Sequence, residues 1–199
     1  LQRLGAGPWL SFGVLLVVLQ LQSYWLHRLS HAWHVLWRFH AVHHSDTEMD
    51  VTTAHRHHPV EVLISALVVL PLLLALGPDP WSLLAYNLLH IVVSMAAHGN
   101  LSWGRWGAWM RWLVLTPGVH RLHHSADPRF TNSNYATMLP VIDWLFRTAT
   151  YRPLSEQAEM PLGLEYFRAS SDSGLWRLLA LPFARWGRSP QASAKAPVA

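Results

Sequence analysis

Histidines that could share a metal ion are concentrated in three short stretches of the sequence. The stretches are His27-x-x-x-His31, His40-x-x-His43-His44-Ser45 and His120-x-x-His123-His124-Ser125. On a helix, residues three and four apart project from one face, so each stretch can present its imidazoles to one ion. An acidic residue closely follows each HxxHHS copy, Asp46 in the first and Asp127 in the second. Because the pattern occurs twice with the same tail, we expect these eight histidines to bind metal.

The number of histidines predicts two metal ions. One zinc ion takes four protein ligands in a structural site, or three and a water in a catalytic site, so eight imidazoles are too many for one ion. His98 lies close enough in sequence to the second HxxHH stretch to join it. For His34, His55 and His57 we expect ordinary hydrogen-bonded or surface roles. Imidazole suits iron, zinc, copper and nickel, so the ligand type leaves the metal open.

Three apolar runs must position these histidines: Trp9–Leu26, Val60–Leu76 and Trp81–Ala97. Each is close to the ~20 residues that cross a bilayer core. Apolar residues make up 51% of the chain and charged residues 13%, which favours a membrane protein over a soluble domain. The second and third runs form a hairpin at Gly77-Pro78-Asp79-Pro80. We expect an all-α, multi-pass integral membrane helical bundle with a His-rich helical cap.

The charged residues predict how this bundle is oriented. Arginines lie on the histidine side of the runs, and the short turn of the hairpin carries no lysine or arginine. The positive-inside rule therefore places the His-rich cap in the cytoplasm. The net charge is +4, but the arginines are scattered and there is one lysine, so we expect no nucleic-acid partner. The absence of cysteine excludes disulfides, thiolate metal sites and cysteine nucleophiles.

The sequence makes further predictions about the helices and the C-terminal tail. On one straight helix, His27 and His40 would point about 140° apart, so we expect a bend between them. The tryptophans and arginines between Trp103 and Leu115 favour an amphipathic helix in the membrane interface. We expect a membrane domain over residues 1–169 and a C-terminal tail over 170–199. In that tail, residues 175–186 would form an amphipathic segment touching the membrane, and the last dozen residues would be disordered.

The motif segments, in order and spacing over about residues 20–150, resemble the fatty acid hydroxylase superfamily, also called the sterol desaturase family. The matching segments are Tyr24-Trp25-Leu26-His27-Arg28-x-x-His31, Leu36-Trp37-Arg38-Phe39-His40-x-x-His43-His44-Ser45, Thr53-Ala54-x-Arg56-x-His58-Pro59-x-Glu61, His98-x-Asn100, Thr116-Pro117-x-x-His120-Arg121-x-His123-His124-Ser125, and Asn134-Tyr135 followed by Asp143-x-Leu145-Phe146-x-Thr148. The family consists of integral-membrane non-haem diiron oxygenases. The chain departs from its usual pattern at Gln20, where members commonly have Asp, and at Ala136 and Arg147, where glycine is common.

The resemblance implies a site and an activity. It implies two iron ions, dioxygen as co-substrate, and a separate electron donor such as a ferredoxin or a cytochrome b5-type reductase system. The product would be a hydroxylated or desaturated lipid made from a fatty acyl chain, a sterol or a carotenoid. The implied iron ligands are His27, His31, His40, His43, His44, His98, His120, His123 and His124, with His58 as a further motif residue. The implied supporting residues are Asp50, Asp127, Asn134 and Asp143.

The residues by themselves leave other functions open. A metal pair beside apolar helices favours oxidation of a hydrocarbon, for which iron is suited and redox-inert zinc is not. A membrane zinc hydrolase would want a carboxylate base, as in HExxH, and that motif is absent from the sequence. A metal carrier or transporter would place its ligands along a path inside the spans, whereas here they flank the spans. A haem protein with two axial histidines would leave most of the cluster unexplained.

Overall fold

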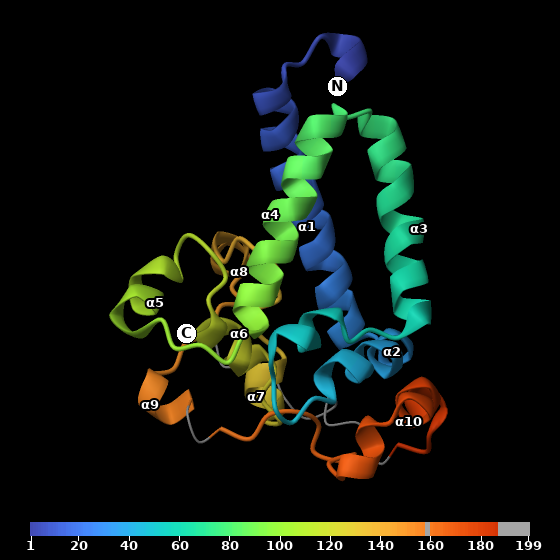
Figure 1. Cartoon of the computed structure of the whole chain (residues 1–199), viewed down its shortest axis with the longest axis vertical. Coiled ribbons are helices and arrows are strands. Elements are labelled where there is room, and N and C mark those ends of the chain that lie inside the picture. The colour runs from blue at the N-terminus through green and yellow to red at the C-terminus, as the bar shows by residue number, and fades with distance from the viewer. Residues whose placement is uncertain (158–159, 187–199) are drawn as a thin grey trace.

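The computed structural model describes residues 1–157 and 160–186, and these form helices joined by short loops (Figure 1). The helices are α1 (Pro8–Ala32), α2 (His34–His44), α3 (Pro59–Leu76), α4 (Pro80–His98), α5 (Gly104–Met110), α6 (Pro117–His123), α7 (Pro128–Thr131), α8 (Val141–Leu145), α9 (Leu154–Gln157) and α10 (Leu175–Ala180), with short 3-10 turns η1 (Gln2–Leu4), η2 (Val51–His55), η3 (Ser170–Ser173) and η4 (Leu181–Phe183). Within the described residues the β-structure is an isolated bridge between Ser125 and Leu162. The predicted all-α fold class is confirmed.

Helices α1, α3 and α4 are long and apolar enough to cross a membrane, with 25, 18 and 19 residues. They extend away from the smaller helices, which gather at one end (Figure 1). The predicted hairpin between α3 and α4 is confirmed. Gly77, at φ 51, ends α3 in the left-handed conformation that glycine adopts readily, and Asp79 caps α4 by accepting a hydrogen bond from the Ser82 amide at 2.9 Å.

The surface of α3 is apolar, as expected for a helix that faces lipid. None of its residues is buried, and Leu63, Leu67 and Leu74 are more than half exposed. An apolar surface of this extent is unusual for a soluble protein. The bundle core lies between α1, α4 and the segments after α5, where Leu15, Leu19, Tyr86, Val93, Ala97, Leu115, Val119 and Met138 pack together.

The predicted bend between the first two histidine stretches is present. Helix α1 continues beyond the apolar run to Ala32 and carries His27 and His31 on its last two turns. Trp33 then has an extended backbone conformation (φ −103, ψ 113), and α2 begins at His34 in a new direction. The break allows histidines of α1 and α2 to face the same interior space.

The interfacial helix is shorter than the sequence predicts. Helix α5 covers Gly104–Met110, and the chain turns before Leu115 instead of continuing as a helix. Trp106, Trp109 and Trp112 are nevertheless exposed, as expected for aromatic side chains that lie at a membrane surface.

The start of the C-terminal tail packs on α2. Arg38 of α2 donates a hydrogen bond to the carbonyl of Ala184 at 2.6 Å, and Leu181 is buried beside Trp37. Leu175 and Trp176 of α10 remain exposed. Membrane contact by this segment therefore stays a prediction. The last dozen residues, for which we expect disorder, lie within residues 187–199, outside the described residues.

Candidate metal centre

Nine histidines gather in two groups at the end of the bundle where the small helices meet. One group consists of His27, His31, His40, His44 and His123, and the other of His43, His98, His120 and His124. Within each group one nitrogen from every ring lies within 4.8 Å of all the others. Both groups combine residues far apart in sequence, brought together by α1, α2, α4 and α6. The structure thus assembles the nine histidines that the resemblance implies as ligands.

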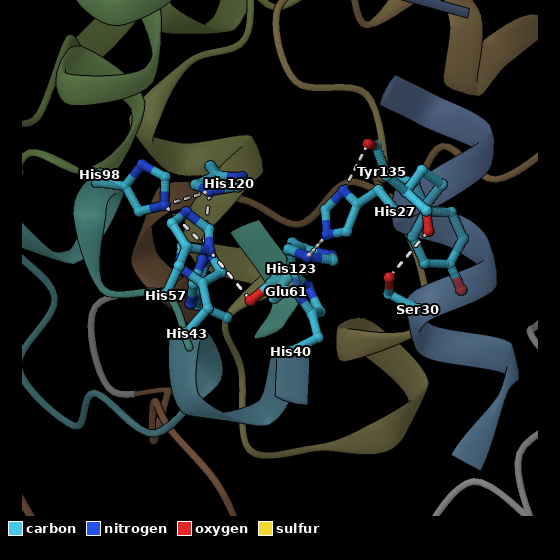
Figure 2. A network of polar contacts seen from close by, with 12 residues as sticks. His27, Ser30, His40, His43, His57, Glu61, His98, His120, His123 and Tyr135 are labelled. Atoms are coloured by element: carbon cyan, nitrogen blue, oxygen red, sulfur yellow. Dashed lines mark hydrogen bonds and ion pairs between the residues drawn. The ribbon is translucent and has the colours of Figure 1, made fainter. Parts of the chain in front are cut away.

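The imidazole nitrogens converge on common points (Figure 2). The Nε2 atoms of His27 and His123 are 3.0 Å apart, and those of His98 and His120 are 2.9 Å apart. The Nε2 atom of His98 also lies 3.3 Å from that of His43. Two nitrogens bound to one ion at right angles, each at ~2.1 Å, would be roughly 3 Å apart. The spacing of these nitrogens therefore fits shared metal ions.

Several ring nitrogens have no other use within the described residues. The Nε2 atoms of His31, His40 and His44 are buried and have no hydrogen-bond partner there. A buried polar atom without a partner is costly, and metal coordination would use each of these lone pairs. The residues present therefore fit a pair of metal ions.

The surroundings keep five of these histidines neutral, which is the form that binds metal. Burial, and then the neighbouring imidazoles, hold the pKa of His43, His44, His120 and His124 well below the usual histidine value. Burial lowers the pKa of His123 to about 3, although its hydrogen bond to the Ser133 carbonyl acts in the opposite direction. Protons therefore compete weakly with a metal for these nitrogens.

Backbone carbonyls orient three of the rings. His27 Nδ1 donates to the Tyr135 carbonyl, His123 Nδ1 to the Ser133 carbonyl and His98 Nδ1 to the Ser94 carbonyl, each at 2.7 Å. With the Nδ1 proton fixed in this way, Nε2 carries the lone pair that faces the interior of the group. Sequence reasoning missed these partners because a carbonyl oxygen carries no residue-specific signal.

Glu61, on the first turn of α3, connects the two groups from outside (Figure 2). Its Oε1 accepts a hydrogen bond from His40 Nδ1 at 2.6 Å, and its Oε2 accepts one from His57 Nδ1 at 3.2 Å. The His57 ring stacks on His43, with centroids 4.7 Å apart. Burial alone would lower the pKa of His57, but Glu61 raises it overall. Glu61 thus orients a histidine of the larger group and holds His57 against the smaller one.

Two of the four predicted supporting residues act on the backbone beside the site. The Asp143 carboxylate accepts hydrogen bonds from the amides of Tyr135 and Ala136 at 2.8 and 2.9 Å. Burial raises its pKa to about 6 despite these bonds. Asn134 lies at φ 54 and its Oδ1 accepts from the Thr150 amide at 2.9 Å. Together they fix the segment whose carbonyls orient His27 and His123.

Asp50, Asp127 and His58 lie outside the two groups. Asp50 caps η2 and Asp127 caps α7 through hydrogen bonds to nearby amides, and neither bonds to a grouped histidine within the described residues. His58 caps α3: its Nδ1 accepts from the Val60 amide at 3.1 Å, and its Nε2 donates to the Leu179 carbonyl at 3.3 Å. Both of its ring nitrogens are therefore occupied by the backbone.

The three departures from the family pattern have structural consequences away from the histidines. Gln20 is fully buried, and its Nε2 donates to the Tyr86 hydroxyl at 3.0 Å, which ties α1 to α4 inside the bundle. Ala136 is fully buried and contributes its amide to Asp143. Arg147 lies at φ 55, a conformation that glycine adopts more readily, which explains the usual glycine there.

A cavity of about 430 Å³ opens from the histidines into the bundle. It reaches His27, His40 and His120 and continues along α1, α3 and α4, where its lining is mostly apolar. Its apolar lining residues include Leu19, Leu26, Leu36, Phe39, Ile64, Val69, Leu73 and Leu83. A volume of this size is in the range of small-molecule sites. A hydrocarbon chain in this cavity would have one segment beside the histidines.

Comparisons with known proteins agree with this site. The family model for fatty acid hydroxylase matches residues 12–148. Human alkylglycerol monooxygenase is 29% identical over 143 residues, 71% of this chain and 31% of that protein. The ornithine lipid hydroxylase OlsE of Rhizobium tropici is 32% identical over 174 residues, 87% of this chain and 50% of that protein. The very-long-chain aldehyde decarbonylase GL1-5 of Oryza sativa subsp. indica is 27% identical over 134 residues, 63% of this chain and 21% of that protein.

The protein therefore belongs to the fatty acid hydroxylase family, and it is a helical membrane protein whose histidine groups could hold metal ions. The chain spans half or less of the length of these curated relatives. No solved structure matches the chain significantly.

Proposed function

We propose that the chain is the catalytic membrane domain of a diiron oxygenase that hydroxylates a lipid. The observation that carries this proposal is the meeting of two histidine groups with an apolar cavity bounded by helices long enough to span a bilayer. A long hydrocarbon chain can enter such a cavity from the membrane with little loss of hydration. The family and its lipid-hydroxylating relatives support the same reaction class.

Iron is the metal that fits this reaction. Bound iron with dioxygen would oxidise an unactivated C–H bond, placing one oxygen atom in the product and reducing the other to water with two electrons and two protons from outside the chain. The electrons would come from a separate protein, a ferredoxin or a cytochrome b5-type reductase system. The chain's own residues would hold the metals, orient the ligand imidazoles, and align the substrate along the apolar part of the cavity. Loss of a second hydrogen from the same substrate would give an alkene, so desaturation is the variant outcome of the same site.

The substrate we propose is a lipid with a long unbranched hydrocarbon segment. Two of the relatives are named for lipid substrates, an alkylglycerol and an ornithine lipid. In the membrane, the three long helices would pass through the bilayer, with the histidine groups on the cytoplasmic side as the arginine distribution predicts.

The cavity gives a zinc hydrolase little support. Glu61 is the acidic residue among the described residues that line the cavity, and both of its carboxylate oxygens accept hydrogen bonds from histidines. It is therefore placed to orient imidazoles rather than to serve as the free base that hydrolysis needs.

Incorporation of isotopically heavy dioxygen tests this function. The iron-loaded protein in lipid nanodiscs, supplied with a reduced ferredoxin, should transfer one heavy oxygen atom to a lipid of a host-membrane extract, as measured by mass spectrometry. His123→Ala should abolish the transfer, and exchange of the exposed Glu48 for Gln should leave it intact. Incorporation of oxygen from heavy water into cleaved lipids, with none from dioxygen, would identify a hydrolase instead.

A further inference from the structure

A second cavity, of about 310 Å³, lies beside the metal centre. It is formed by the loop after α4, by α5 and by the start of α6, and Trp103, Gly107 and Thr116 are among its lining residues. His98 is the one described residue that lines both this cavity and the larger apolar one. The larger cavity follows the membrane helices, whereas this one lies under the tryptophan-rich helix α5.

Two arginines, Arg111 and Arg121, line this second cavity, and no acidic residue occurs among its described lining residues. Within the described part of the chain neither guanidinium forms an ion pair, although Arg56, Arg129 and Arg152 all do. Two cations facing one cavity repel each other, and an anion between them would remove this cost.

The arginine side chains are held in place with donors to spare. The Arg111 guanidinium lies 3.7 Å above the centre of the Tyr151 ring, which fixes its plane, and its buried Nε has no hydrogen-bond partner among the described residues. Arg121 donates its Nε to the Gln157 carbonyl at 3.0 Å, which leaves the terminal nitrogens for a ligand. A planar guanidinium with free N–H groups is well suited to phosphate oxygens.

Two more observations indicate what kind of molecule carries the anion. Trp106, Trp109 and Trp112 are exposed on the same part of the chain, so the cavity lies at the depth where lipid headgroups occur. Gln157, 2% exposed, also lines the cavity, and its buried Oε1 accepts no hydrogen bond from described residues. A hydroxyl or ammonium group next to a phosphate would satisfy this oxygen.

We propose that this cavity binds the phosphate group of an anionic membrane lipid through Arg111 and Arg121. The site is separate from the proposed oxidation chemistry, because it uses none of the metal ligands to hold the phosphate. Its position beside His98 would bring a bound lipid headgroup to the edge of the metal centre. A lipid headgroup and a free phosphate ester share the same chemistry, so the experiment must distinguish them.

Calorimetric titration of the purified, metal-loaded protein in neutral detergent micelles tests the proposal. The probes are dioctanoyl phosphatidic acid, the headgroup-free dioctanoylglycerol, and inorganic phosphate. Phosphatidic acid should bind, and dioctanoylglycerol should not. Arg111→Gln and Arg121→Gln should each weaken binding about tenfold, since each removes charge-assisted hydrogen bonds. Arg105→Gln is the matched control, because Arg105 is on α5 but does not line the cavity.

The outcomes separate the alternatives. Equal affinity of phosphatidic acid for the wild type and for both cavity variants would overturn the proposal. A further outcome is that inorganic phosphate binds as tightly as phosphatidic acid and depends on the same arginines. That result would overturn the proposal that the bound phosphate belongs to a lipid. If a glutamine variant does not fold, Arg111→Lys keeps the positive charge but loses the planar pair of donors, and it should still bind more weakly than the wild type. These measurements need no catalytic turnover, so they are independent of the proposed oxygenase activity.

Discussion

Replacement of Glu61 by Gln should selectively weaken the binding of one of the two metal ions. Glu61 accepts a hydrogen bond from His40 Nδ1 at 2.6 Å, and His40 belongs to the five-histidine group. The substitution keeps the shape of the side chain but removes its charge. The hydrogen bond from His40 would then go to a neutral acceptor. The amide nitrogen that replaces the second oxygen is a donor, so it could not accept the hydrogen bond from His57.

The size of the effect follows from the strength of such bonds. A hydrogen bond to a charged group contributes about 1.5–3 kcal/mol, and a neutral one about 0.5–1.5 kcal/mol. The midpoints of these ranges differ by about 1.3 kcal/mol, which corresponds to nearly tenfold in affinity, the lower end of what loss of a ligand-orienting partner costs at metal sites. The metal affinity of the four-histidine group should change little, because Glu61 acts on that group only through the stacking of His57 on His43.

Anaerobic titration of metal-free protein with ferrous iron, in competition with a chelator of known affinity, measures both sites. For Glu61→Gln we expect one dissociation constant to rise about tenfold and the other to stay within twofold of the wild type. The exposed Glu48, changed to Gln, is the matched control for loss of a negative charge and should affect neither. Equal weakening of both sites, or no change in either, would refute the assigned role of Glu61.

Three further predictions concern stability. Asp143→Ala should lower the free energy of unfolding by about 3 kcal/mol in a denaturant or thermal assay, because the buried amides of Tyr135 and Ala136 lose their acceptor; a loss below 1 kcal/mol would contradict this. The metal-free protein should melt at a lower temperature at pH 5 than at pH 7. The unfolded chain binds protons below pH ~6.5 at histidines whose folded pKa is depressed, about 3 for His123, so stability is lost as the pH falls through this range by up to ~1.4 kcal/mol per group and pH unit. Asp143 and His57, whose pKa values are raised, act in the opposite direction, but they are two groups against five such histidines outside the spans. An unchanged melting temperature would refute the interpretation that these five histidines are neutral in the folded protein. Arg147→Gly should raise the unfolding free energy by about 0.5–1 kcal/mol. Arg147 has φ 55, and the strain of this conformation in a residue with a side chain exceeds the entropy that glycine loses on folding. A fall in melting temperature would contradict this prediction.

The parts of the site that depend on local spacing were predictable from the sequence. HxxHH places three rings on one helical face wherever the helix lies, and the 100° step per residue required the bend that the structure has at Trp33. His98 could be added because it ends the third apolar run near the second stretch. The hairpin followed from its Gly-Pro-Asp-Pro turn.

The parts that depend on long-range packing were not predictable. Glu61 lies 21 residues after His40, and only the path of the chain through η2 brings the two together. His58 has the same motif context as the grouped histidines, but its position before Pro59 makes it the cap of α3. The docking of the tail on Arg38 likewise joins segments about 145 residues apart, for which a single sequence carries no signal.

The most direct test of the two-metal centre is the metal content after anaerobic purification from iron-replete cells. Zinc generally outcompetes ferrous iron for such ligands, so zinc found after exposure to air would say little about the native metal. The protein must therefore be kept anaerobic. We expect about two irons per chain in the wild type, and about one in His123→Ala and in His120→Ala, because each substitution removes a ligand from a different group. One metal per chain in the wild type, or tightly bound zinc with no iron, would contradict the account.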